Sequence, residues 1–389
     1  MIEQIKEMAV SAFNEIVEIR RHLHQYPELS FQEYKTSAYI KSILTTWGIP
    51  FTEDIADTGI VVLLQGNNPE LKTIALRADF DALPIIEENE VDYCSVNKGV
   101  MHACGHDAHT ASLLGVVKIL NSLKSEWEGS VKFVFQPAEE QFPGGAQQMI
   151  KEGVLEDPKV EKMFAQHVFP ELEVGKVGFC SGQYMASADE IYITIKGVGG
   201  HAALPHKYKN PIVAAAKLIT NLEEDFSQYQ EMPSVFAIGF VQANGHTNVI
   251  PESIELKGTF RTMNEEFRNI SHEKMQAIAL AIAKEYGVDV DFSIIKGYPS
   301  LYNNEPLTKD AIGFAKEYMG EENVITLGVR MTAEDFSYYS HEVPSCFYRL
   351  GTANASKGIA HGLHTSRFNI DEEALKVGMG LMTYLTIKN

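Results

Sequence analysis

The sequence has few cysteines and no long apolar segment. Its four cysteines are widely scattered and too few for a disulfide scaffold, so we expect a reducing, cytoplasmic location. No apolar run approaches the roughly 20 residues that a membrane-spanning helix needs. The N-terminus lacks the basic start, apolar block and cleavage site of a secretory signal, and its apolar residues recur instead at the spacing of an amphipathic helix.

Positive charge is also scarce. The chain carries 33 Lys and Arg against 52 Asp and Glu, for a net charge of −19. Such a field repels the phosphate backbone of nucleic acids and anionic membrane surfaces alike. We therefore expect neither a nucleic-acid nor a membrane partner.

The length of 389 residues exceeds what one hydrophobic core usually supports, which predicts two domains. Strand-like runs alternate with helical stretches in the first half of the chain, at 61–65, 73–79, 131–136 and 162–167. This alternation predicts an open, mostly parallel α/β sheet flanked by helices. The order then changes to β-α-β-β-α-β, which is typical of an α+β ferredoxin-like unit. We expect a catalytic domain over 1–186 and 299–389, with an inserted domain over 187–298.

The densest chemical signal is MHACGHDAHT at 101–110, with three histidines beside Cys104 and Asp107. Thiolate and imidazole are the ligands that zinc prefers. For His102 or His109 alone, a supporting or structural role is the better expectation. Asp107 is suited to orient a ligating imidazole, because metal-bound histidines usually need a carboxylate or carbonyl partner.

Acidic and histidine side chains also fall at or just after predicted strand ends, namely Asp79, Glu139, Glu140 and His167. Open α/β sheets bind ligands beyond the carboxyl ends of their strands. Of two adjacent glutamates there, one can bind metal while its neighbour transfers a proton. Near the C-terminus, either histidine of AHGLHT, His361 or His364, is a candidate ligand.

At this point a family resemblance emerges over essentially the whole chain. Its markers occur in order as RRHLHQYPELSFQE, RADFDALPI, MHACGHDAHT, QPAEE, AQHVFP, GVGGHAALPH, TNVIPE, GTFRT, AEDFSYY and HGLHT. The sequence resembles the dinuclear-metal aminoacylase and carboxypeptidase family, in the branch of hippurate hydrolases and indoleacetyl-amino-acid hydrolases.

The resemblance implies two divalent metal ions, with Cys104 shared between them. The implied ligands are Cys104, His106, Glu140, His167 and His364. Zinc is the first expectation, with manganese, cobalt or nickel as alternatives, because a thiolate stands here where many members have a carboxylate. The resemblance also makes Glu139 the general base and gives Asp79 or Asp81 a supporting role.

The inserted domain is implied to act as a lid and as the surface of a homodimer. His201, Asn248 and Arg261 are expected to reach the substrate, with the lid histidine serving the neighbouring subunit. His201 or Asn248 suits an oxyanion donor, and Arg261 suits a substrate carboxylate. A surface charge on a strand edge is the other interpretation of Arg261.

These residues predict a metal-dependent amidohydrolase that cleaves N-acetyl or N-aroyl amino acids or small peptides with metal-activated water. N-acetyl-diaminopimelate deacetylase and dipeptide carboxypeptidase activities are alternatives within the family. A thiol hydrolase, with Cys104 as nucleophile and His106 as base, would leave both glutamates and two histidines without a role. A non-catalytic binding protein is expected to lack the base or the ligands, and both are present.

Overall fold

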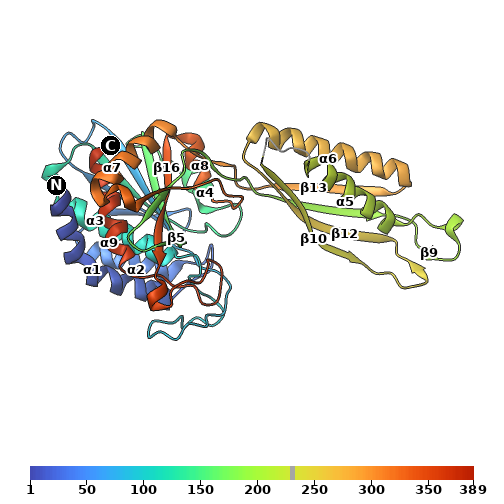
Figure 1. Ribbon diagram of the computed structural model, residues 1–389, viewed down its shortest axis with the longest axis horizontal. Coiled ribbons are helices and arrows are strands. Elements are labelled where there is room, and N and C mark those ends of the chain that lie inside the picture. The colour runs from blue at the N-terminus through green and yellow to red at the C-terminus, as the bar shows by residue number, and fades with distance from the viewer. Residues whose placement is uncertain (228–232) are drawn as a thin grey trace. The chain divides into compact units, whose positions relative to one another are not determined.

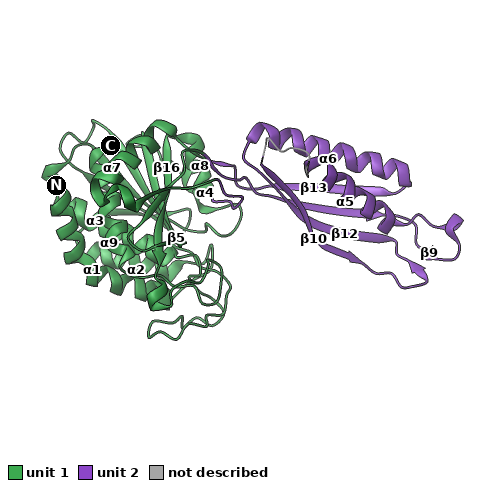
Figure 2. Ribbon diagram, in the orientation of Figure 1, with its two compact units in different colours: residues 1–182, 302–328, 335–389 green, residues 183–301, 329–334 purple. Residues whose placement is uncertain are grey.

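The computed structural model describes residues 1–227 and 233–389, which form two compact units (Figures 1 and 2). Unit 1 comprises Met1–Gly182, Tyr302–Gly328 and Asp335–Asn389, and unit 2 comprises Gln183–Leu301 and Val329–Glu334. Strands β7 (Gly182–Met185) and β14 (Leu301–Asn303) span two of the points where the chain passes between units.

An eight-stranded mixed sheet forms the centre of unit 1, in the order β1-β2-β4-β3-β5-β16-β6-β15. Its strands are β1 (Phe51–Ile55), β2 (Gly59–Gln65), β3 (Thr73–Asp79), β4 (Ser130–Gln136), β5 (Lys162–Glu173), β6 (Val177–Phe179), β15 (Val324–Thr326) and β16 (Ser345–Ala353). The central strands β4, β3, β5 and β16 are parallel. Every residue of β3 and β4 is buried, as expected for parallel strands that are covered on both faces.

Helices cover this sheet, which confirms the predicted flanked α/β architecture (Figure 1). They are α1 (Ile2–Gln25), α2 (Tyr34–Thr46), α3 (His106–Ser122), α4 (Gly145–Lys151), α7 (Glu305–Met319), α8 (Ser337–Glu342) and α9 (Ala374–Lys388), with short 3-10 turns at η1 (Lys124–Glu126), η3 (Glu321–Asn323) and η4 (Ala355–Lys357). Figure 1 shows α1, α3 and α9 on one side of the sheet and α4 and α8 on the other. Within the described residues, we find no helix with the length and apolarity needed to cross a membrane.

Unit 2 has the predicted β-α-β-β-α-β order and forms an antiparallel sheet, β10-β12-β8-β13. Its elements are β8 (Asp189–Lys196), α5 (Pro211–Ser227), β10 (Ser234–Ala243), β12 (Ser253–Thr262), α6 (Glu265–Tyr286) and β13 (Asp289–Lys296). Alternate residues of β8, Ile191, Ile193 and Ile195, share a buried core with both helices. Asn264 caps α6 by accepting a hydrogen bond from Phe267 N at 2.8 Å.

Unit 2 also includes residues 329–334, called here the strap, which lie outside the expected range 187–298. Ala186 N donates to the strap carbonyls of Arg330 and Thr332, both at 3.1 Å, and Arg330 N donates to Tyr184 O at 2.8 Å. The guanidinium of Arg261 donates to Met331 O at 3.1 Å. The strap is therefore bound to unit 2 by backbone and side-chain hydrogen bonds.

Candidate active site

Cys104 and His106 lie on either side of a glycine that the backbone requires. Gly105 has φ +82°, and a Cβ atom there would lie 2.4 Å from Val168 Cγ2. A side chain at this position would therefore meet both backbone strain and a clash. Because α3 begins at His106, this turn brings the thiol and the imidazole together at the N-terminus of one helix.

Asp81 fixes the orientation of His106. His106 Nδ1 lies 3.1 Å from Asp81 Oδ1 and 3.0 Å from Asp81 O, while Nε2 is buried without a hydrogen-bond partner among the described residues. Burial opposes the charged ring, but Asp79 and Asp81 outweigh it and raise the pKa of His106 to about 10. Nε2 is therefore the ring atom that can bind a metal ion, and it must lose its proton to do so.

His167 approaches Cys104 from the sheet. Its Nδ1 donates to Val168 O at 2.7 Å, and its Nε2 lies 3.4 Å from Cys104 Sγ. The expectation that a strand ends at His167 was wrong, because β5 continues to Glu173. Pairing between β3 and β5 nevertheless stops at Arg77 and Ala165, so His167 lies level with the carboxyl end of β3. Burial, and secondly Arg349, hold the pKa of His167 well below its ordinary value, so the ring is neutral.

His364 completes the cluster around Cys104. Its Nε2 lies 3.3 Å from Cys104 Sγ and 3.2 Å from Glu140 Oε1. Its backbone N donates to Ala103 O at 2.8 Å, which ties the C-terminal loop to the turn at Cys104. His361, the other histidine of this motif, is exposed and lines an open cavity with Glu88 and Arg367.

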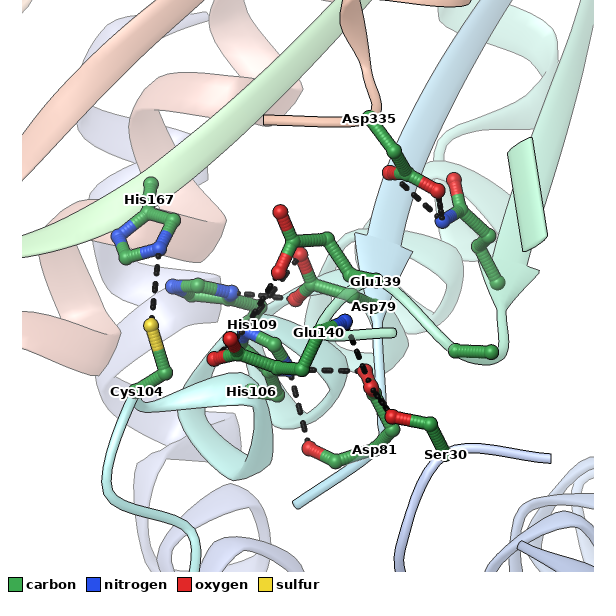
Figure 3. Close-up of polar contacts among 12 residues, drawn as sticks. Ser30, Asp79, Asp81, Cys104, His106, His109, Glu139, Glu140, His167 and Asp335 are labelled. Atoms are coloured by element: carbon green, nitrogen blue, oxygen red, sulfur yellow. Dashed lines mark hydrogen bonds and ion pairs between the residues drawn. The ribbon is translucent and has the colours of Figure 1, made fainter. Parts of the chain in front are cut away.

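Two triads of potential ligand atoms therefore meet at the thiol. Cys104, His106 and His167 form one, and Cys104, Glu140 and His364 form the other, with the ligand atoms of each triad within 4.8 Å of one another. Figure 3 shows Cys104, His106, His167 and both glutamates converging on one region. A buried imidazole nitrogen without a partner, a thiol and a carboxylate suit a divalent ion of the zinc type. The residues present therefore fit a pair of metal ions that share Cys104.

The remaining residues of the histidine-rich motif have other partners. His109 donates from Nδ1 to Asp79 Oδ1 at 2.6 Å and accepts at Nε2 from Val168 N at 2.9 Å, so both its nitrogens are occupied. Asp107 accepts from Arg20 Nε at 2.7 Å and from His24 Nδ1 at 2.8 Å, which links α3 to α1. His102 is buried, and neither ring nitrogen has a hydrogen-bond partner in the described chain.

Sequence reasoning missed a buried network behind the site. Arg77 donates to Asp79 Oδ2 at 2.5 Å and to Asp335 Oδ1 at 2.7 Å, and Gln136 Nε2 donates to Asp335 Oδ2 at 2.7 Å. Burial opposes ionisation of Asp79, but Arg77, His106 and His109 together outweigh it and hold the pKa of that carboxyl well below its usual range. An arginine inside the apolar run TIALRAD was the available signal, since a buried cation needs carboxylate partners.

The Cys104 thiol is not arranged as a free nucleophile. Burial, followed by Glu140 and Glu139, raises the pKa of the Cys104 thiol well above its ordinary value. A catalytic cysteine needs the opposite shift, because the thiolate is the attacking species. Metal ligation, by contrast, deprotonates a thiol outright.

In unit 2, His201 lies in β9 (Gly200–His201), which pairs with β11 (Val249–Ile250) near the 3-10 turn η2 (Pro205–Lys207). Asn248 directly precedes β11. Ala202 N donates to Asn248 O at 3.0 Å, and both His201 and Asn248 are exposed. Ala203 N donates to His201 Nδ1 at 3.1 Å, so the proton of a neutral ring resides on Nε2. Arg261 is half-buried, and no carboxylate of the described chain pairs with it.

Comparison with known proteins places this geometry in a family. Residues 75–388 match the model of peptidase family M20/M25/M40. An N-acyl-L-amino acid amidohydrolase of Geobacillus stearothermophilus is 40% identical over 304 residues, covering 77% of this chain and 81% of that protein. An N-acetyl-L-cysteine deacetylase of Bacillus subtilis is 37% identical over 366 residues, covering 93% and 85%.

A solved structure agrees with these relatives. A dinuclear metal-binding peptidase of the M20 family from Bacillus subtilis superimposes with a TM-score of 0.82 at 34% identity, covering 97% of this chain and 98% of that one. The chain belongs to peptidase family M20/M25/M40. It is accordingly a hydrolase of that family.

Proposed function

We propose that this hydrolase cleaves the amide bond of N-acyl amino acids, using two divalent ions and Glu139 as general base. The observation that carries the proposal is the meeting of two ligand triads at Cys104, with Glu139 beside them. Glu139 is buried, and its Oε2 lies 3.9 Å from His106 Nε2. Two relatives whose names specify N-acyl amino acids support this substrate class.

In the proposed reaction, two divalent ions would be held by Cys104, His106, Glu140, His167 and His364. Zinc is the first candidate for these ions. They would supply a Lewis acid and lower the pKa of water. Glu139 takes the proton of the attacking water and delivers it to the leaving amine. His201 donates from Nε2 to the developing oxyanion, a contribution of roughly 3–4 kcal/mol for one such donor. Arg261 and Asn248 hold the substrate, with the guanidinium on its carboxylate.

Unit 2 is proposed to act as the lid and the homodimer surface. Strand β10 lies at the edge of its sheet, with Val235, Phe240 and Val241 exposed. An exposed edge strand with apolar side chains is suited to pairing with a second copy.

The test compares two adjacent glutamates. Glu139→Gln is expected to retain metal, measured by elemental analysis, while turnover of N-acetyl amino acids is abolished. Glu140→Gln is the matched variant and is expected to lose metal and activity together. Near-normal turnover in Glu139→Gln would remove the base assignment.

Substrate choice needs a separate screen. N-acetyl and N-aroyl amino acids, N-acetyl-diaminopimelate and dipeptides are offered to protein loaded in turn with zinc, manganese, cobalt and nickel. Preference for N-acyl amino acids supports the proposal. Preference for dipeptides or for the diaminopimelate derivative would move the protein to another activity of the same family.

A further inference from the structure

Buried carboxylates accept backbone hydrogen bonds from the loop that carries Glu139 and Glu140 and from the first turn of α4, which follows it. Asp81 Oδ2 accepts from Glu140 N at 2.9 Å, and Asp335 Oδ2 accepts from Ala146 N at 3.0 Å. A third carboxylate, Glu33, accepts from Ala138 N through Oε1 at 2.8 Å. Asp81 and Asp335 also contact other groups of the site or its support. Glu33 comes from the N-terminal segment, and its second oxygen accepts from Thr58 Oγ1 at 3.3 Å.

The residue that Glu33 holds has an unusual backbone conformation. Ala138 has φ +53°, in the left-handed region that an alanine avoids because of its Cβ atom. Gly145 N donates to Ala138 O at 3.0 Å, so this residue is held through both its N–H and its carbonyl. Since Glu139 follows directly, the backbone angles of Ala138 determine where the Glu139 side chain starts.

We propose that Glu33 is a positioning residue for Glu139 and acts by accepting the hydrogen bond of Ala138 N–H. The inference rests on the proposed function, in which Glu139 is the general base. Without this acceptor the Ala138 peptide is free to rotate toward ordinary backbone angles, and the Glu139 carboxylate moves with it. A displacement of about 1 Å is enough to cost on the order of a hundredfold in rate.

The required property is hydrogen-bond acceptance. Burial, and secondly Asp81, raise the pKa of Glu33 to about 7. Oε1 nevertheless keeps a lone pair that can accept from Ala138 N–H in both protonation states. A glutamine in this position retains the acceptor and can donate from its amide to Thr58 Oγ1. A methionine of similar length removes the acceptor and leaves the volume filled.

The experiment uses zinc-loaded protein and an N-acetyl amino acid as substrate, with kcat, KM and bound metal measured for Glu33→Met and Glu33→Gln. Glu33→Met is expected to lower kcat by roughly a hundredfold, with KM and metal content close to wild type. Glu33→Gln is expected to restore kcat to within a few-fold of wild type. Glu28→Ala is the matched control, because Glu28 accepts from Thr36 N and Oγ1 in the same segment, away from the loop. It is expected to keep kcat.

Three results would overturn the positioning role: unchanged kcat in Glu33→Met, loss of metal in proportion to activity, or equal kcat in the methionine and glutamine variants. Circular dichroism checks that each variant folds, and if Glu33→Met does not, Glu33→Leu replaces it under the same criteria. Glu139→Gln is assayed alongside. If that variant is active, the proposed function fails whatever Glu33 does; if it is inactive while Glu33→Met turns over normally, only the positioning role fails.

Discussion

Asp81 contacts a ring nitrogen of His106 with one carboxylate oxygen and the backbone N–H of Glu140 with the other. Oδ1 lies 3.1 Å from His106 Nδ1, and Oδ2 accepts from both Glu140 N, at 2.9 Å, and Ser30 Oγ, at 2.6 Å. One carboxylate thus orients two proposed ligands at once. All three of its partners donate, so only a group that accepts at both oxygens satisfies them.

Asp81→Asn is therefore expected to weaken metal binding by roughly 10- to 100-fold, because an amide nitrogen must face one of these donors. Competition with a chromogenic chelator measures the affinity. Glu88→Gln, in the exposed cavity near His361, is the control and is expected to bind metal normally. An Asp81→Asn protein with wild-type affinity would show that this carboxylate does not orient the ligands.

Gly105→Ala tests the turn between Cys104 and His106. The added methyl combines a positive φ with a clash against Val168, and we expect a loss of about 2–4 kcal/mol in the free energy of unfolding. Gly153 has φ +84° and open space around its Cβ position, so Gly153→Ala isolates the backbone cost of about 1 kcal/mol. Urea denaturation of both variants checks the difference, and equal losses would dismiss the Val168 contact.

Glu33→Gln has a predicted pH dependence in stability. Because folding raises the pKa of Glu33 from 4.5 to about 7, the folded wild type holds this proton more tightly than the unfolded chain. Wild-type stability therefore falls, relative to the glutamine variant, as pH rises from 4.5 to 7, and the difference stays constant above 7. The expected change is about 2–3 kcal/mol. Denaturation of the chelator-treated proteins across this range measures it; a difference that does not vary with pH would contradict it.

Mixing two inactive variants tests whether His201 serves the neighbouring subunit. If it does, a heterodimer of His201→Ala and Glu139→Gln contains one complete site, and random exchange is expected to restore about a quarter of wild-type activity. If His201 serves its own subunit, every site in the mixture lacks one group and activity stays near zero. Unmixed variants, incubated in the same way, are the control.

The sequence predicted the long elements well because their burial patterns are continuous. The expected strand 73–79 matches β3 at both ends, and the expected strand 131–136 matches β4 to within one residue. The strands β6 and β15 have three residues each, too few for a periodicity to show, and neither was predicted.

The candidate site could likewise be predicted only in part from the sequence. Cys104 and His106 stand in one local motif, so their proximity follows from the sequence. Grouping them with His167 and His364 depended on the family resemblance, because no local pattern specifies contacts between residues 63 and 260 positions apart. Glu33 lies within the marker SFQE, yet nothing in that string indicates a carboxylate buried under a loop more than a hundred residues away.

The strap has a practical consequence for dissecting the molecule. Domains inserted at one point in a chain can be excised, transplanted or expressed alone with a single pair of cuts. Here residues 329–334 return to unit 2 after the chain has already rebuilt part of unit 1, so a fragment ending at Leu301 lacks the partners of Ala186 N and Arg261. A chimera that exchanges specificity between relatives must therefore replace two separate gene segments, the second of them only six codons long.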